Sequence, residues 1–404
     1  MDFNDTAGEA EFRAEAKAWL AQNAPAHELP LGHVMSEEEE VRRGRAWQAA
    51  KAADGFGAIL LPREVGLRGG TSMEAVIFAQ EEAKYNVHNI IPISIGLNFA
   101  IPTILKHGTA DQLARFGGPT LRGEIIWCQL FSEPGAGSDL AALSTRAVKQ
   151  GDNWVINGQK VWSSWAHHAD WGILIARTDP DLPKHKGLTF FVIDMKTPGI
   201  EIRPIRQISG KSDFNETFLT DVVIPDSCRI GSEGEGWACA MTVLMSERLG
   251  SGKDVEGHSV RVLIDRARQP DAFGQRLIDR ADVQARLAAW YIQEQGVKHF
   301  RARLLTQLSK GQRPGAESGA SKLLFTNKLQ QTAAYAMEML GYEGIVSEAD
   351  DNLQPMIFEN YLWASALRVA GGADEVLKNQ IAERVLGMPG EIRTDKTAAY
   401  NQRA

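Results

Sequence analysis

The spacing of apolar residues changes twice along this 404-residue chain, and each change marks a different kind of secondary structure. From Glu9 to about Leu121 apolar residues recur at helical spacing, and between about Gly123 and Gly236 they recur with a period of two. The helical period then returns and continues to Leu386. This order predicts an α+β fold with a helical domain at 1–122, a β domain at 123–235 and a second helical domain at 236–404.

Within the middle segment, β-rich runs predict strands at 153–156, 159–162, 171–177, 188–194, 200–205 and 217–224. Asn157-Gly158 separates the first two runs, and both residues tolerate positive φ, so the pair predicts a two-residue hairpin turn. In the first helical segment, Ser36 with Glu39 and Thr71 with Glu74 predict helix starts capped by a hydroxyl that accepts from the amide three residues on.

The composition excludes several classes of protein. With 44 Lys and Arg against 51 Asp and Glu, the net charge of −7 argues against nucleic-acid binding. No window approaches the ~20 apolar residues of a membrane span, and the polar, acidic start does not resemble a signal peptide, so we expect a cytoplasmic protein. Cys128, Cys228 and Cys239 lack metal-type spacing, and we expect three reduced thiols.

Several apparent ligand motifs are incomplete. Gly250-Ser251-Gly252-Lys253 resembles the end of a phosphate-binding loop, but the earlier glycine that such a loop needs is Glu247. Gly234-Glu235-Gly236 lacks the third glycine and the strand context of a dinucleotide fingerprint. His167-His168 has no Cys or carboxylate at metal-ligand spacing, and we expect these two histidines to be solvated, with no metal bound.

Two stretches are more informative. The first runs from Trp127 to Asp139 and contains Ser-Glu-Pro-Gly-Ala-Gly-Ser-Asp, and the second runs from Asn157 to Ser164 and ends Lys-Val-Trp-Ser-Ser. The glycine loop exposes backbone amides, and a Trp flanked by hydroxyls offers a flat face with hydrogen-bonding edges. Either stretch alone reads as a turn with a core tryptophan, but together they suit a flat heterocycle with polar edges.

In their order and spacing, the two stretches resemble motifs of the acyl-CoA dehydrogenase family of flavoproteins, and the resemblance covers nearly the whole chain. It implies an N-terminal helical domain, a β-barrel-like middle domain and a C-terminal four-helix bundle. It also implies FAD as cofactor and α,β-dehydrogenation of an acyl-CoA to the trans-2-enoyl-CoA, as in β-oxidation. The implied cofactor contacts are Phe131, Ser132, Trp162, Ser163, Ser164 and Gly372, and the implied substrate contacts are Ser138, Arg248 and Gly371.

The family places its catalytic base at either of two positions. The more common one is the Glu of a Glu-Gly-Thr triplet before the last helix, where this chain has Gly371. The other lies on the first helix of the C-terminal domain, and the run Met-Ser-Glu-Arg-Leu here implies Glu247 as the base. Glu375 is a rival carboxylate, although the helix dipole already explains an acid in a first turn. Without the resemblance, Glu247 would read as a solvated carboxylate paired with Arg248 or Lys253.

The family's contacts to a neighbouring subunit's FAD are altered in this chain. Pro270 interrupts the run between Arg268 and Phe273-Gly274, and Glu338 stands where an amide would contact pyrophosphate. The resemblance implies a tetramer. The altered contacts suggest that this chain is the catalytic subunit of an α2β2 assembly of two unlike subunits. A homotetramer with looser FAD contacts is the alternative.

The acyl group is predicted from the residues that follow Glu247 and from the position of the base. Gly250, Ser251 and Gly252 are small, and a base on the first helix accompanies bulky acyl groups in the family, so we expect a bulky, 2-branched or steroid side-chain acyl-CoA. Electron-transfer flavoprotein is the expected electron acceptor. Two other readings keep the fold: a non-catalytic partner subunit, and a flavin oxidase or monooxygenase.

Overall fold

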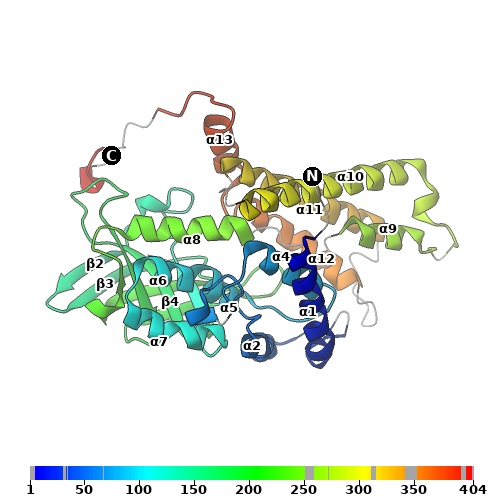
Figure 1. Cartoon of the computed structure of the whole chain (residues 1–404). Coiled ribbons are helices and arrows are strands. Elements are labelled where there is room, and N and C mark those ends of the chain that lie inside the picture. The colour runs from blue at the N-terminus through cyan, green and yellow to red at the C-terminus, as the bar shows by residue number, and fades with distance from the viewer. Residues whose placement is uncertain are drawn as a thin grey trace. The chain divides into compact units, whose positions relative to one another are not determined.

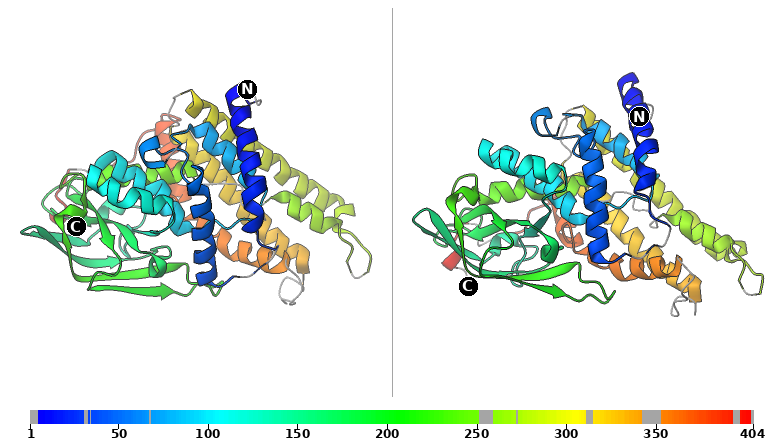
Figure 2. Two further views of the ribbon diagram at one scale, coloured as in Figure 1. Left: turned by 60° about the horizontal axis from the view of Figure 1, so that its bottom comes forward. Right: turned by 90° about the horizontal axis from the view of Figure 1, so that it is seen from below.

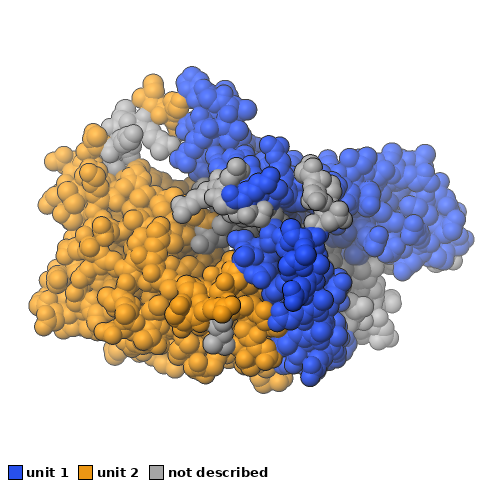
Figure 3. All heavy atoms as spheres, viewed as in Figure 1, with its two compact units in different colours: residues 1–34, 71–87, 248–389 blue, residues 35–70, 88–247, 390–404 orange. Residues whose placement is uncertain are grey.

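The structure is a computed structural model that describes residues 5–30, 33, 35–66, 68–250, 259–271, 273–310, 315–341, 353–392 and 397–402. The chain forms two compact units, each assembled from three separate stretches (Figure 3). Unit 1 comprises residues 1–34, 71–87 and 248–389, and unit 2 comprises 35–70, 88–247 and 390–404. This grouping does not follow the linear order of the three predicted domains, whose boundaries stay predictions.

Unit 2 contains a mixed β-sheet. Its strands are β1 (Trp127–Leu130), β2 (Arg146–Gln150), β3 (Asn153–Lys160), β4 (Trp171–Arg177), β5 (Leu188–Asp194), β6 (Ile200–Ile205), β7 (Phe214–Pro225) and β8 (Arg229–Ile230). They are ordered β6-β7-β3-β2-β4-β5-β8, with β1 paired to β4. The pairs β1–β4 and β2–β4 are parallel and the others are antiparallel.

The bounds of β4, β5 and β6 are those predicted from the sequence, because these runs alternate or are continuously apolar between clear turn residues. The predicted hairpin at Asn157-Gly158 is wrong, since β3 continues through both residues. The pair instead forms a bulge against β7, where the Asn157 side chain accepts from the Asp221 N–H at 2.9 Å and donates to the Asp221 carboxylate at 3.0 Å. The turn lies earlier, at Gly151-Asp152 between β2 and β3.

Unit 2 also contains α-helices. They are α2 (Glu37–Ala53), α3 (Arg63–Gly66), α5 (Ile91–Ile95), α6 (Ile101–His107), α7 (Ala110–Leu121) and α8 (Gly236–Gly250), whose final residues belong to unit 1. In Figures 1 and 2 the cyan helices α6 and α7 lie against the green strands. Phe116 of α7 contacts the rings of Trp127 and Trp171 at centroid distances of 5.4 and 4.8 Å, and this aromatic cluster anchors the helices to β1 and β4.

All three cysteines are free and buried in unit 2, as expected from their spacing. Cys128 and Cys239 belong to the core between the sheet and its helices. Burial raises the pKa of the Cys239 thiol to about 12, so the group stays protonated and unreactive at neutral pH.

A C-terminal segment, residues 397–402, lies on unit 2 and is called the strap here. Its Tyr400 N–H donates to the Leu182 carbonyl at 3.0 Å, and the Tyr400 hydroxyl lies 3.1 Å from the Ala142 carbonyl. The Arg177 guanidinium sits 3.5 Å from the centroid of the Tyr400 ring. The strap therefore covers the end of β4.

Unit 1 is helical in the part that the structure describes. Its helices are α1 (Ala7–Asn23), α4 (Ser72–Glu82), α9 (Val260–Arg268), α10 (Ala281–Ser309), α11 (Gly319–Leu340), α12 (Leu353–Ala364) and α13 (Asp374–Arg384). Helix α1 packs on α4, and α11 packs between α10 and α12. No helix among the described residues has both the length and the apolar character that crossing a bilayer requires.

Both predicted helix caps are present. The Ser36 hydroxyl accepts from the Glu39 N–H at 3.3 Å at the start of α2, and the Thr71 hydroxyl accepts from the Glu74 N–H at 3.2 Å at the start of α4. At α4 the Glu74 side chain also accepts from the Thr71 N–H, which completes a capping box.

Candidate functional site

The first predicted motif forms a tight loop after β1. Glu133 and Ala136 exchange two backbone hydrogen bonds of 3.0 Å, which close a turn. Phe131 is buried and packs edge-on against Phe190 at 5.8 Å, whereas Ser138, at the end of the loop, is exposed. The loop therefore has a fixed base and an exposed tip.

A buried ion pair anchors this loop to the second motif. Lys160, at the end of β3, donates to the Phe131 carbonyl at 3.0 Å and to the Glu133 carboxylate at 2.8 Å. Glu133 also accepts from the N–H groups of Ser144 and Thr145 at 2.7 and 2.9 Å. Burial raises the pKa of the Glu133 carboxyl, but the charge and hydrogen bonds of its partners outweigh burial and lower the pKa to about 2.

The second motif continues from Lys160 into a turn that presents Trp162. The Val161 N–H donates to the Ser132 carbonyl at 2.9 Å and so joins the two motifs directly. Trp162 has a left-handed backbone with a φ of 61°, and its side chain is 59% exposed beside Phe214. A bulky residue rarely adopts this backbone conformation, and such outliers gather at ligand sites.

Ser163, the residue after Trp162, has a hydroxyl group without a hydrogen-bond partner in the described part of the chain. The Ser163 N–H donates to the Asn215 carbonyl at 3.0 Å, and the Ser163 carbonyl accepts from the Asn215 amide at 2.9 Å. The Ser163 hydroxyl is buried and has no hydrogen-bond partner among the described residues. Ser164, the next residue, is half-buried, and so is Ser132 of the first motif. An exposed indole face and an orphaned hydroxyl fit a flat heterocycle with polar edges.

The predicted glycines of the C-terminal segment lie in unit 1. Gly371 and Gly372 have φ values of 66° and 97° and form the turn before α13. Lys322 of α11 donates to the Gly372 carbonyl at 2.7 Å and pairs with the buried Asp374 at 3.2 Å. Arg368 pairs with the same Asp374 at 2.5 Å. The sequence analysis did not predict a role at the site for Lys322, Arg368 or Asp374. Their charges are the one signal in the sequence that distinguishes them.

The remaining predicted residues are less fully described. Glu247 and Arg248 belong to the last turn of α8, and their side chains lie outside what the structure describes. Glu375 is exposed in the first turn of α13. Ser251, Gly252 and Lys253 lie outside the described residues.

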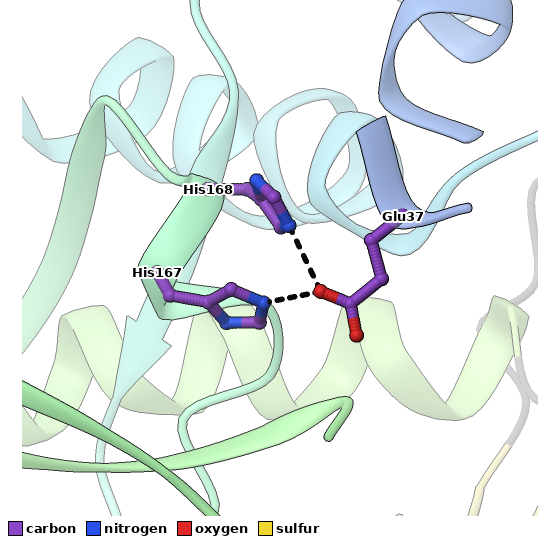
Figure 4. Close-up of side chains that lie close together, drawn as sticks. All are labelled: Glu37, His167 and His168. Atoms are coloured by element: carbon purple, nitrogen blue, oxygen red, sulfur yellow. Dashed lines mark hydrogen bonds and ion pairs between the residues drawn. The ribbon is translucent and has the colours of Figure 1, made fainter. Parts of the chain in front are cut away.

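The expectation that His167 and His168 are solvated is wrong. Both rings are half-buried, and both Nε2 atoms contact the same oxygen of Glu37, at 2.8 and 3.1 Å (Figure 4). The carboxylate was missed because it comes from α2, 130 residues earlier than His167, where local spacing carries no signal. Burial raises the pKa of the Glu37 carboxyl, but the two histidine hydrogen bonds outweigh it and lower the pKa below its ordinary value.

The chain matches family models along nearly all of its length. The acyl-CoA dehydrogenase N-terminal domain matches residues 6–124, the middle domain residues 128–222 and the C-terminal domain residues 234–386. The predicted α+β class and the predicted family are therefore confirmed.

Individual relatives agree with the family models. The chain is 36% identical to the acyl-CoA dehydrogenase IpdE1 of Mycolicibacterium smegmatis over 95% of its own length and 98% of that protein. It is 41% identical to the acyl-CoA dehydrogenase FadE34 of Mycobacterium tuberculosis over 85% of its length, but spans only 46% of that protein.

A solved structure, the Tcur3481-Tcur3483 steroid ACAD, superposes with a TM-score of 0.80 at 27% identity, over 97% of this chain and 100% of that one. The family models, the relatives matched along their full length and the fold all indicate the same family. The chain belongs to the acyl-CoA dehydrogenase family, whose members are FAD-dependent oxidoreductases that act on CH–CH bonds.

Proposed function

We propose that this chain binds FAD and catalyses the α,β-dehydrogenation of an acyl-CoA thioester, with Glu247 as the base. The observation that carries the proposal is the direct joining of the two β-domain motifs, through the Val161–Ser132 hydrogen bond and the Lys160–Glu133 ion pair. This arrangement fixes Trp162 and its flanking serines in one rigid turn, as a binding face for a flat ring requires.

Phe131, Ser132, Trp162, Ser163, Ser164 and Gly372 are the proposed FAD contacts. When bound, FAD supplies the acceptor for the hydride that leaves the β carbon of the acyl chain. Trp162 covers one face of the ring, and the Ser163 hydroxyl, which lacks a partner among the described residues, is available for a polar edge.

Three features near the Gly371 turn support Glu247 as the base. Position 371 itself has no side chain. Asp374 is buried at 2% exposure between Lys322 and Arg368, where it holds the turn. Glu375 is exposed at the start of α13, where its ordinary role is to interact with the helix dipole. A base for a weakly acidic α proton needs a site that excludes water, whereas Glu375 is exposed.

The same turn suits a second role. We assign the Gly371 N–H as a donor to the thioester oxygen, where negative charge develops as the α proton leaves. A backbone donor survives the loss of the family's Glu side chain at this position. Ser138 and Arg248 are the proposed contacts to the rest of the acyl-CoA.

For the substrate, we propose a bulky acyl group, such as a steroid side chain. The structural neighbour is itself called a steroid ACAD, which supports this class, and the small residues that follow Glu247 in the sequence support it too. The proposed electron acceptor is electron-transfer flavoprotein.

For the assembly, we propose an α2β2 tetramer with an unlike subunit. The structural neighbour carries a double name, Tcur3481-Tcur3483, which supports two unlike chains. In this chain Phe273 is 89% exposed beyond α9, so it is available for contact with another subunit. Glu338 stands where an amide would contact pyrophosphate, and its carboxylate would repel that group. Arg286 lies 3.7 Å from Glu338, but an exposed ion pair of this kind offsets only part of the repulsion between the carboxylate and the pyrophosphate.

The test is anaerobic absorbance of the purified chain, alone and with a co-expressed unlike subunit, on addition of short-chain, long-chain and steroid side-chain acyl-CoA esters. We expect the flavin absorbance to bleach with the steroid ester and Glu247→Gln to abolish bleaching while retaining bound flavin. Glu375→Gln is the matched control and keeps the activity. Bleaching by Glu247→Gln at the wild-type rate would overturn Glu247 as the base.

Two other functions predict different outcomes. A non-catalytic partner subunit would leave bleaching unchanged when Glu247→Gln is introduced into the complex. A flavin oxidase or monooxygenase would consume oxygen in proportion to the substrate, without an added electron acceptor. FAD at one per chain in the purified chain alone would favour a homotetramer.

A further inference from the structure

Among the residues that the structure describes, one group of potential ligands converges closely enough to hold a metal ion. It consists of Glu37, His167 and His168, whose ligand atoms all lie within 4.8 Å of one another. Glu37 is the first residue of α2, and the histidines belong to the 3₁₀ turn Ala166–His168 between β3 and β4. All three residues lie in unit 2.

The convergence is on a single oxygen atom. A carboxylate that merely accepted two hydrogen bonds could place one on each oxygen, but both Nε2 atoms contact Oε2, at 2.8 and 3.1 Å. Figure 4 shows the other carboxylate oxygen turned away from the rings. Bonds of about 2.0–2.1 Å to a tetrahedral zinc ion separate neighbouring ligand atoms by roughly 3.3 Å. The two separations between Nε2 and Oε2 therefore need only a small increase to admit an ion.

The histidine rings are held in place by their own turn. Trp165 is buried, has a left-handed φ of 55°, and donates its backbone N–H to the Asp213 carbonyl at 2.8 Å. Its indole stacks on the His167 ring with an interplanar angle of 15°. The imidazoles are therefore oriented toward Glu37 before any ion arrives.

The surroundings of the histidine rings limit the affinity of the three residues for a metal ion. The His167 Nδ1 atom is buried and has no hydrogen-bond partner in the described part of the chain. A metal on Nε2 requires the ring proton on Nδ1, where ligating histidines usually find an acceptor. The side chains of Glu37, His167 and His168 are 36%, 19% and 21% exposed, so water can complete the coordination.

We propose that Glu37, His167 and His168 form a binding site for a divalent transition-metal ion of the zinc type, with two nitrogens, one carboxylate oxygen and water as ligands. The ion would tie the start of α2 to the turn that follows Trp162. The site is separate from the residues assigned to flavin and acyl-CoA, so its test does not depend on the proposed dehydrogenation.

The test is titration of the metal-free, tag-free full chain with Co²⁺, followed by its visible absorption, and then competition with Zn²⁺. We expect one saturable site per chain with the intense bands of four- or five-coordinate cobalt. His168→Gln keeps an N–H donor for Glu37 but removes the imidazole ligand, and we expect it to weaken binding at least about tenfold. His107→Gln is the matched control, since His107 lies outside the cluster and contacts Thr242.

Glu37→Gln provides a second variant that keeps an oxygen acceptor for both histidines and removes the charge. Circular dichroism and the melting temperature establish that each variant is folded. The proposal requires weaker Co²⁺ binding in both variants and wild-type affinity in His107→Gln. It is wrong if the wild-type chain shows no saturable site, or if folded His168→Gln binds Co²⁺ as tightly as the wild type.

Discussion

At the scale of single residues, the pair Glu133–Lys160 does the most to position the proposed flavin site. Lys160 is fully buried and Glu133 is 6% exposed, so neither charge is solvated. Each charge is instead met by the other and by backbone groups, because Lys160 contacts the Phe131 carbonyl and Glu133 accepts the Ser144 and Thr145 N–H groups. Removing one partner leaves the other charge uncompensated in the core.

Lys160→Met is therefore expected to lower the free energy of unfolding by about 3–5 kcal/mol, measured from urea denaturation. Lys149→Met is the matched control, since Lys149 is 45% exposed and lies 3.8 Å from Asp226, and its expected effect is within about 1 kcal/mol. The double variant Glu133→Gln/Lys160→Met should recover part of the loss. An equal loss in the single and double variants would contradict the role assigned to the uncompensated Glu133 charge.

The same carboxylate gives stability a specific dependence on pH. The pKa of Glu133 is about 2 in the folded chain and near its ordinary value of 4.5 in the unfolded chain. Its contribution is therefore fully present above pH 4.5 and is lost as the pH falls toward 2. Between these limits we expect wild type to lose about 2–3 kcal/mol relative to Glu133→Gln, measured by denaturation at each pH. Parallel profiles for the two proteins would contradict this prediction.

The sequence locates residues that lie within one compact motif, although their roles at the site stay predictions, and it does not reveal partners that are distant in the sequence. Trp162, Ser163 and Phe131 lie in two compact motifs, which the structure joins through the Val161–Ser132 hydrogen bond and the Lys160–Glu133 ion pair. The environment of His167 and His168 could not be predicted, because Glu37 reaches them only through the packing of α2 in unit 2. Local spacing holds no information about such a pairing.

At the scale of elements, the turn before α13 depends on two glycines in the left-handed region. Gly371 has a φ of 66°, which other residues adopt with strain, whereas Gly296 lies in the interior of α10, where an added Cβ would meet open space. Gly371 and Gly296 therefore affect stability in opposite ways: Gly371 makes the turn possible, whereas Gly296 weakens helix α10.

Gly371→Ala is expected to destabilise the chain by about 1–2 kcal/mol, and the matched Gly296→Ala to stabilise it by about 0.5–1 kcal/mol. Thermal melting of the two variants beside the wild type measures both signs in one experiment. A stabilising Gly371→Ala would mean that the turn does not need the left-handed conformation.

Element prediction succeeded for β4, β5 and β6 and failed at Asn157-Gly158. Asn-Gly is a hairpin signal when its own strands pair with each other, but here β3 pairs with β2 on one side and β7 on the other. A side chain on Gly158 would meet Thr145 of the neighbouring chain segment at 2.4 Å, so the glycine serves a close approach of two backbones. Whether Asn157-Gly158 forms a turn or a bulge depends on which strands pair with β3. The pattern of a single sequence does not specify these partners.

At the scale of the whole molecule, each compact unit is assembled from stretches that are far apart in the sequence. Unit 2 receives the strap only after the chain has passed through unit 1. Arg177 is 3% exposed and also donates to the Ala141 and Leu143 carbonyls at 2.7 and 3.1 Å, so Tyr400 covers a side chain that already holds the loop after Ser138.

Tyr400→Ala is expected to destabilise the chain by about 1–3 kcal/mol, because it removes the ring from the Arg177 guanidinium together with the contact to Ala142. Tyr400→Phe keeps the ring and should cost about 1 kcal/mol or less. Urea denaturation followed by tryptophan fluorescence measures both. Equal losses in the two variants would assign the effect to the hydroxyl instead of the ring.

The strap also sets an order of events during synthesis. Tyr400 is made 258 residues after Ala142, the backbone group that its hydroxyl contacts. While the ribosome is still translating the helices of unit 1, the sheet of unit 2 can already pair its strands, but the buried Arg177 has no aromatic cover. Nascent unit 2 therefore lacks this contact until Tyr400 has been synthesised, and a chain truncated before Tyr400 would leave the Arg177 guanidinium without its aromatic ring.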